Sequence, residues 1–160
     1  MIIKEAVDRK TIIRIIDAKN KAMGILKKYN INVNDIKITL EEELQKIADT
    51  VIDGDTIRIR INPNRITEFN HYDLIFIILH ELFHELLLAE IDEIDIDDFD
   101  RLLYNKATDL EINQVVAKMI NTHNLSNKLM TSVIWPNYYN LPFGKRWFFY
   151  YKELKKRNAR

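Results

Sequence analysis

The chain has 160 residues, enough for one domain with a buried core, and its 47% hydrophobic and 30% charged residues exclude a disordered chain. Its formal net charge is zero, which gives no overall electrostatic argument for binding nucleic acid or a membrane. Cysteine is absent, so a cysteine-ligated metal site and a cysteine nucleophile are excluded, and a reducing compartment is favoured.

The N-terminal part of the chain predicts one helix followed by short elements. Residues 4–29 carry apolar side chains at helical spacing and predict an amphipathic helix. Its apolar positions are Ile12, Ile15, Ile16, Met23 and Leu26. Residues 37–40 predict a short strand, and residues 41–48 predict a helical turn with Thr39 and Glu42 as its capping box.

The clearest strand signal follows a turn. The Asp-Gly pair at positions 53–54 is typical of a hairpin turn, and Thr56–Ile61 then alternates polar and apolar residues without a break. This alternation predicts a strand with one buried face and with Arg58 and Arg60 on the other face.

The next segment predicts a helix that is buried on most sides. Asn70 is a candidate N-cap with Asp73 in the first turn, and residues 71–89 are apolar nearly all round the helix. Residues 74–79 form the most apolar stretch, which is far too short to span a bilayer. Charges interrupt the N-terminus every few residues, so it lacks the apolar core of a signal peptide. We therefore expect a soluble, cytoplasmic protein with no membrane partner.

The C-terminal half predicts two more helices. Residues 100–120 form the first, and residues 147–156 form the second, which is aromatic and basic. The acidic residues 90–100 and the Asn-rich residues 121–144 predict loops.

Positions 80–84 carry the motif His-Glu-x-x-His, which holds half of the four histidines of the chain. His80 and His84 stand one above the other on the predicted helix and can occupy two positions around a tetrahedral metal. Glu81 lies about 100° further round the helix and can reach a metal-bound water. Two ordinary core histidines are the structural alternative, but each would need a buried partner. The motif therefore predicts zinc-dependent hydrolysis, in which Glu81 takes a proton from the water that attacks a carbonyl.

A catalytic zinc site needs a third protein ligand beside an open position. Asp109 is our candidate, because the line Asn105, Asp109, Asn113 follows i+4 steps on the side of the 100–120 helix that we expect to be buried. The two amides could hold the carboxylate in place. Glu111, which points elsewhere on this helix, is the rival ligand, and an ordinary surface aspartate is the structural alternative.

Residues 70–155 resemble a known family. A His-Glu-x-x-His helix followed by an aromatic-Asn-x-Ala-x-Asp-x-x-Ile-Asn segment is typical of the metallopeptidase domain that bacteria and phages often carry ahead of a von Willebrand A-like domain. The second segment is matched at Tyr104, Asn105, Ala107, Asp109, Ile112 and Asn113. The C-terminal part is also similar, at Leu141, Pro142, Tyr150, Tyr151 and Leu154. The resemblance implies a zincin whose zinc is held by His80, His84 and Asp109.

The length of the chain predicts a single domain spanning residues 1–160. The resemblance implies that this domain has an α+β, zincin-like fold, with a small twisted sheet packed on helices and a buried motif helix. In zincins the strand before this helix is an edge that pairs with an extended peptide, and Thr56–Ile61 is our candidate. His123, Tyr138 and Tyr139 are candidates for stabilising an oxyanion, with ordinary surface positions as the alternative.

Three classes of function remain open. The first is a zinc peptidase acting on peptide or protein substrates. The second is a DNA-associated protease similar to the SprT-like proteases, in which residues 145–160, with seven basic side chains and one acidic, would hold nucleic acid. The third is a metallopeptidase fold that has become a binding or regulatory module of a phage or toxin–antitoxin system. The presence of Glu81 disfavours the third, because such modules usually lose the catalytic base.

Overall fold

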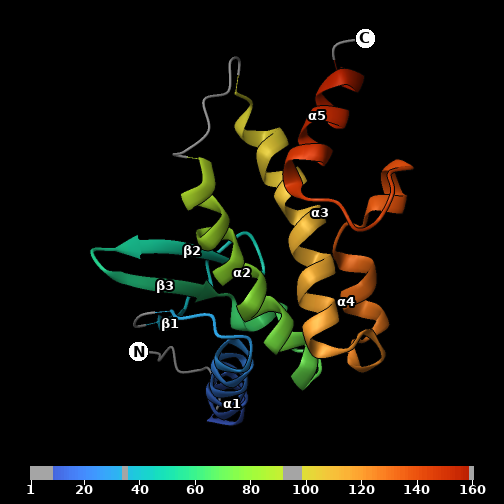
Figure 1. Cartoon of the computed structure of the whole chain (residues 1–160). Coiled ribbons are helices and arrows are strands. Elements are labelled where there is room, and N and C mark those ends of the chain that lie inside the picture. Colours follow the sequence, from blue (N-terminus) through green and yellow to red (C-terminus); the bar gives the residue numbers. More distant parts are fainter. Residues whose placement is uncertain (1–8, 34–35, 92–98, 159–160) are drawn as a thin grey trace.

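The computed structural model describes residues 9–33, 36–91 and 99–158. Within these residues the chain has an α+β fold of five α-helices and one three-stranded sheet (Figure 1). The elements are α1 (Arg9–Lys28), β1 (Ile36–Leu40), β2 (Ala48–Asp53), β3 (Thr56–Ile61), α2 (His71–Ile91), α3 (Arg101–Ile120), α4 (Asn127–Ser132) and α5 (Trp147–Asn158). Among the described residues, no helix is long and apolar enough to cross a membrane.

The sheet has the order β1-β3-β2, with β1 parallel and β2 antiparallel to the central strand β3. The predicted alternation in β3 is confirmed, because Ile59 and Ile61 are buried while Arg60 pairs with Asp49 on β2. The expectation that β3 is an edge strand is wrong, since both of its sides already pair with a neighbour. The edges of this sheet are β1 and β2.

β2 was not expected from the sequence. A two-residue turn joins it to β3, with Gly54 at a φ of +60°, a conformation that glycine adopts without strain. The helical turn expected over residues 41–48 is wrong, and Thr39 lies in β1 rather than capping a helix. The segment before β2 is instead a loop, because the buried Asn62 amide donates to two of its backbone carbonyls.

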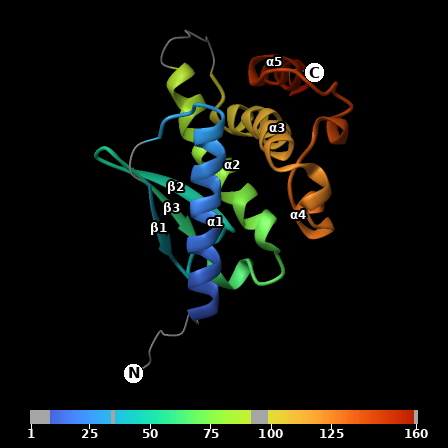
Figure 2. The same cartoon turned by 60° about the horizontal axis from the view of Figure 1, so that its bottom comes forward.

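α2 packs against α1 on one side and α3 on another (Figure 2). Residues 74–79 are all buried, as predicted. The predicted N-cap is confirmed: Asn70 Oδ1 accepts from Asp73 N at 2.8 Å, and Asp73 Oδ2 accepts from Asn70 N at 2.9 Å. The same carboxylate accepts bonds from the backbone N–H and hydroxyl of Ser126, so it ties the start of α2 to the start of α4.

α1 contacts α2 through a narrow stripe that includes two alanines. The buried residues of this stripe are Ile15, Ala18, Ala22 and Leu26. Two positions that we expected on the apolar face are exposed, Ile12 at 39% and Ile16 at 52%. The reason is that the small alanines, and not these isoleucines, face α2. Residues 4–8 of the expected helix lie outside the described residues.

The C-terminal part of the chain contains α3, which forms one wall of the site, together with α4 and α5. α3 is confirmed and begins at Arg101, after the N-cap Asp100, whose side chain accepts from two backbone N–H groups of the first turn. α5 is confirmed and packs against α3. The loop expected over residues 121–144 is partly wrong, because Ser126 caps the short helix α4. Residues 92–98 of the expected acidic loop lie outside the described residues.

Candidate metal centre

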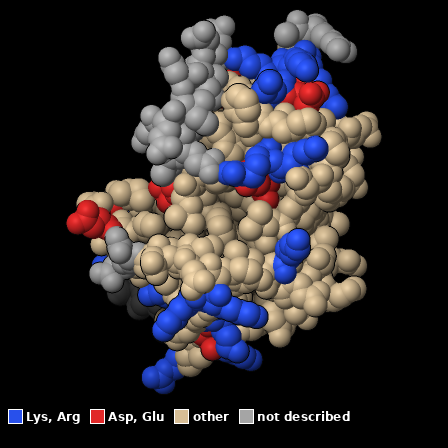
Figure 3. Space-filling model, in the orientation of Figure 1, with Lys and Arg blue, Asp and Glu red and all other residues tan. Residues whose placement is uncertain are grey.

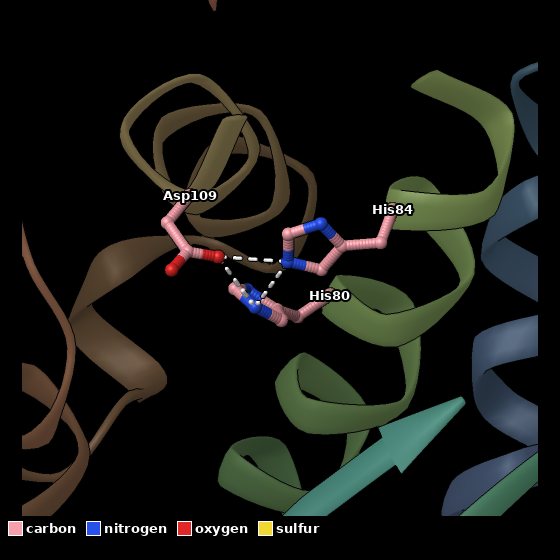
Figure 4. A group of neighbouring side chains, drawn as sticks. All are labelled: His80, His84 and Asp109. Atoms are coloured by element: carbon pink, nitrogen blue, oxygen red, sulfur yellow. Dashed lines mark hydrogen bonds and ion pairs between the residues drawn. The ribbon is translucent and has the colours of Figure 1, made fainter. Parts of the chain in front are cut away.

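α2 and α3 bring together the three side chains expected to hold a metal (Figure 4). His80 and His84, one turn apart on α2, place their Nε2 atoms 3.1 Å from each other. Asp109 on α3 places Oδ1 at 2.7 Å from His84 Nε2 and 3.2 Å from His80 Nε2. The three ligand atoms therefore converge, all within 4.8 Å of one another.

The donor atoms suit a tetrahedral cation. Zinc binds imidazole nitrogen and carboxylate oxygen at about 2.0–2.2 Å, so two ligands of one tetrahedral ion lie roughly 3.3 Å apart. The observed separations of 2.7, 3.1 and 3.2 Å are slightly shorter, so small side-chain shifts would admit the ion. Two imidazoles and one carboxylate also leave a fourth position for water or substrate.

Asn113 determines which nitrogen of His80 carries the proton. Its Nδ2 donates to Ile134 O at 2.9 Å, so its Oδ1 is the atom that accepts from His80 Nδ1, 2.8 Å away. In neutral His80 the lone pair on Nε2 then points toward Asp109 Oδ1. Two electron-rich atoms this close need a cation between them, either a metal or a second proton. The three side chains could hold such a metal ion, with Asn113 orienting the ring of His80.

The charges of the cluster keep Asp109 ionised. Burial raises the pKa of Asp109, but hydrogen bonds with His80 and His84 outweigh it and hold that pKa far below its ordinary value. Burial lowers the pKa of His80, but its hydrogen bond with Asp109 and the negative charge of Glu81 outweigh that effect and raise the pKa above its ordinary value. Asp109 is therefore present as a carboxylate, the form that binds a metal.

Glu81 lies beside the cluster and is held by Thr50, which was not expected from the sequence. Thr50 Oγ1, on β2, donates to Glu81 Oε2 at 3.1 Å. Burial raises the pKa of Glu81 above its ordinary value, although the positive charges of His80 and His84 and the bond from Thr50 oppose it. A raised pKa suits a carboxylate that takes up and returns a proton near neutral pH. The Asp-Gly turn was the signal for Thr50, since a two-residue hairpin turn has a strand on each side.

The rival ligand Glu111 faces a different part of the molecule. Its carboxylate accepts from Arg146 Nε and from Trp147 N, both at 2.7 Å, and so joins α3 to the start of α5.

The two amides that we expected to hold the carboxylate of Asp109 have other surroundings. Asn113 is buried and bonds to His80 rather than to Asp109, whereas Asn105 is exposed.

The cluster opens into a cleft of about 460 Å³ between α2, α3 and β2. The edge strand contributes Asp49 and Thr50, and α3 contributes Arg101 and Tyr104 to the lining. One side of β2 pairs with β3 and the other side is a free edge of the sheet, and Ala48, Asp49 and Thr50 of this strand line the cleft.

The residues proposed for an oxyanion lie elsewhere. His123 is exposed in a short 3-10 turn after α3. Tyr138 is 75% exposed and packs edge-on against Tyr139. Among the described residues, the lining of the cleft includes none of the three.

No family model, curated protein or solved structure matches this chain. The family resemblance therefore rests on the residues that carry it.

Replacing Asn113 by alanine should weaken zinc binding by about 10–100-fold, because His80 loses the acceptor that orients its ring. Competition with a chromogenic chelator measures the zinc dissociation constant. Asn105→Ala, which removes an exposed amide from the same helix, is the matched control and should leave the constant unchanged. Equal affinities for Asn113→Ala and wild type would contradict this role of Asn113.

Proposed function

We propose that the protein is a zinc-dependent metallopeptidase of the zincin type. The observation that carries the proposal is the convergence of His80, His84 and Asp109 in an open cleft with Glu81 beside them. The packing of the motif helix α2 against strands β2 and β3 supports the same class.

Each side chain has a role in peptide-bond hydrolysis. His80, His84 and Asp109 would hold the ion, and Asn113 would keep the lone pair of His80 directed at it. Zinc, when bound, lowers the pKa of water and polarises a carbonyl group. Glu81 accepts the proton of the attacking water and returns it to the leaving amine, since it borders the cleft and Thr50 holds its carboxylate in place.

The substrate would be an extended peptide added to the free edge of β2, rather than to β3. A peptide paired there gains backbone hydrogen bonds along the strand. Because Thr50 on β2 contacts Glu81, such a peptide would pass its carbonyl groups in front of the catalytic carboxylate.

The segment that carries the family resemblance supports the same site. Asp109 supplies the third ligand atom, and Asn113 contacts the first histidine of the motif. We therefore place the protein with the metallopeptidase domains that precede von Willebrand A-like domains, as part of this proposal.

A DNA-associated protease has less support. Lys and Arg side chains gather over α5 and over α1 (Figure 3). However, α5 packs on the side of α3 that carries Glu111, whereas Asp109 on the same helix faces α2. Part of the positive charge is also paired within the chain, since Arg146 bonds to Glu111 and Lys156 to Glu153.

The direct test is cleavage of a quenched fluorescent peptide library by zinc-loaded protein. A zinc chelator should stop the cleavage, and added zinc should restore it. If the fully zinc-loaded protein cleaves no peptide in the library, the peptidase proposal fails.

Thr50→Val should lower kcat by about tenfold or more, because Glu81 loses the hydrogen bond that positions its carboxylate. Thr50→Ser keeps the hydroxyl and should recover most of the rate. Both variants should bind zinc as wild type does, which separates positioning from metal loss. A Thr50→Ser variant as slow as Thr50→Val would show that the methyl group, and not the hydroxyl, matters.

A further inference from the structure

Three isoleucines are exposed side by side on α1: Ile12 at 39%, Ile13 at 59% and Ile16 at 52%. Ile16 lies four residues after Ile12 and three after Ile13, so the three side chains are neighbours on the helix surface. They span about 100° of the helix circumference, and Ile13 lies roughly opposite the stripe that packs on α2. We call these three residues the isoleucine patch. Large apolar side chains that gather on a surface, rather than lying singly, indicate a place of contact.

The rest of α1 is strongly basic. Its 20 residues include seven Lys or Arg and one acidic residue, Asp17, which lies 3.5 Å from His71 Nδ1. Arg14 donates to the carbonyl of Phe69. Within the part of the chain that the structure describes, the other six cations of α1 have no ion-pair partner: Arg9, Lys10, Lys19, Lys21, Lys27 and Lys28. The chain is neutral overall, but this helix carries a local positive excess (Figure 3).

The cations border the isoleucine patch on both sides. At about 100° per residue, Lys19 lies beside Ile12 on one side of the patch. Lys10 lies beyond Ile13 on the other side, and Arg9 lies in line with the patch, one turn before it. Helices that lie in a lipid surface have this arrangement, because their apolar groups enter the bilayer while long cationic side chains reach back to the head groups.

We propose that α1 docks on an anionic lipid bilayer, with the isoleucine patch inserted among the lipids and the surrounding cations on the lipid phosphates. The expectation of no membrane partner rested on the net charge and on the length of the apolar stretch. Contact of one helix with a lipid surface depends instead on its local charge and its exposed apolar groups. Among the described residues, none from α1 lines the cleft, so docking through α1 leaves the candidate metal centre open.

Other occupants fit this surface less well. A second copy would bring the cations of its α1 against those of the first, and three half-exposed isoleucines supply only part of the roughly 800 Å² per partner that a stable interface buries. Nucleic acid would attract the cations but would leave the isoleucine patch without an apolar partner. An acidic protein would need carboxylates matched to both sides of the patch, whereas a bilayer presents negative charge all round the inserted groups.

The test is flotation of the full chain with vesicles of phosphatidylcholine and phosphatidylglycerol, with vesicles of phosphatidylcholine alone as the reference. Binding to the anionic vesicles should be at least about tenfold stronger, because each basic residue near such a surface strengthens binding about fivefold. Binding should weaken as salt is added, and it should be equal with and without zinc, since the inference does not depend on the peptidase proposal. Equal binding to the two kinds of vesicle would overturn the inference.

Replacing two members of the patch tests the insertion. The Ile13→Gln, Ile16→Gln double variant should bind anionic vesicles at least about tenfold more weakly, because two apolar side chains no longer enter the bilayer. Both positions are exposed, so the midpoint of thermal unfolding should stay unchanged. Ile52→Gln, Leu102→Gln is the matched control, with residues 50% and 80% exposed on β2 and α3, and should bind as wild type does. A patch variant that binds as tightly as wild type would refute the insertion.

Replacing two cations tests the charge of the same surface. Lys10→Gln, Lys19→Gln should weaken binding about 25-fold, at roughly fivefold for each charge. Lys118→Gln, Lys152→Gln removes two exposed cations from α3 and α5 and should have little effect. Equal losses in the two pairs would show that total charge, and not α1, governs binding. Self-association that Ile13→Gln, Ile16→Gln abolishes would assign the surface to a second copy, and DNA binding tighter than vesicle binding would assign it to nucleic acid; either result would overturn the inference.

Discussion

Substituting His80, His84 or Asp109 with alanine should remove most of the zinc that wild type retains after purification without chelator. We expect roughly one equivalent of zinc in wild type. Each variant should lose more zinc affinity than the 10–100-fold that is contributed by a residue hydrogen-bonded to a metal ligand. The reason is that each residue supplies one of the three converging atoms, so no other atom of the cluster can replace it. Elemental analysis gives the zinc content, and chelator competition gives the affinity.

Glu111→Ala is the control for this prediction, because it removes a carboxylate from the same helix as Asp109. It should keep the zinc. It should lower the free energy of unfolding by about 2–3 kcal/mol, since the buried carboxylate accepts from Arg146 and from Trp147 N at the start of α5. Stoichiometric zinc in a His80→Ala, His84→Ala double variant would refute the metal centre. Zinc lost from Glu111→Ala and kept in Asp109→Ala would refute the choice of third ligand.

Local signals predicted the two helices, α2 and α3, that carry His80, His84 and Asp109. The apolar run with Asn70 and Asp73 at its start predicted α2, because the residues that cap this helix and those that bury it follow one another in the sequence. The i+4 spacing placed His80 and His84 on one face, and the same rule placed Asp109 on a separate face from Glu111. The helix α4 was missed because its six residues are too few to show a periodic pattern.

Non-local pairing accounts for the main errors. β1 and β3 are neighbours in the sheet although β2 lies between them in the sequence, and no residue in these strands signals that pairing in advance. Whether β3 is an edge or the centre of the sheet therefore could not be predicted from its alternation. β2 was missed because its aspartates at positions 49 and 53 lower its strand propensity, although the turn that follows it was recognised. The contact between Thr50 and Glu81 was missed with it.

Packing between helices decided the remaining detail of the site. We expected Asn105 and Asn113 to hold the carboxylate of Asp109. The packing of α3 on α2 instead places Asn113 against the ring of His80, and its second bond to Ile134 O fixes the orientation of the amide. These contacts join His80 on α2 to Asn113 on α3 and to the backbone of Ile134, and both partners are far from α2 in the sequence.

Glu81→Gln should keep the zinc and the fold but lose peptide hydrolysis by at least a hundredfold. General-base catalysis contributes about 10²–10⁴-fold, and an amide cannot accept the proton of the attacking water. The exchange is nearly isosteric, and a Gln oxygen can still accept the bond that Thr50 donates to Glu81. We therefore expect kcat to fall while zinc affinity and the midpoint of thermal unfolding stay close to wild type. Single-turnover cleavage of the best library peptide measures the effect.

The same variant separates the peptidase from its two rivals. A binding or regulatory module would show no cleavage in wild type, and its partner binding would survive Glu81→Gln. A DNA-associated protease would bind DNA with an affinity that falls steeply with salt, and neutralising Lys155, Lys156 and Arg157 would flatten that slope. A plain peptidase instead predicts weak or salt-insensitive DNA binding together with the hundredfold loss. Glu85→Gln is the matched control, because Glu85 also lines the cleft and directly follows the second histidine, whereas Thr50 donates to Glu81. A Glu81→Gln variant that cleaves as fast as wild type would exclude Glu81 as the base and leave the hydrolytic chemistry without a proton acceptor.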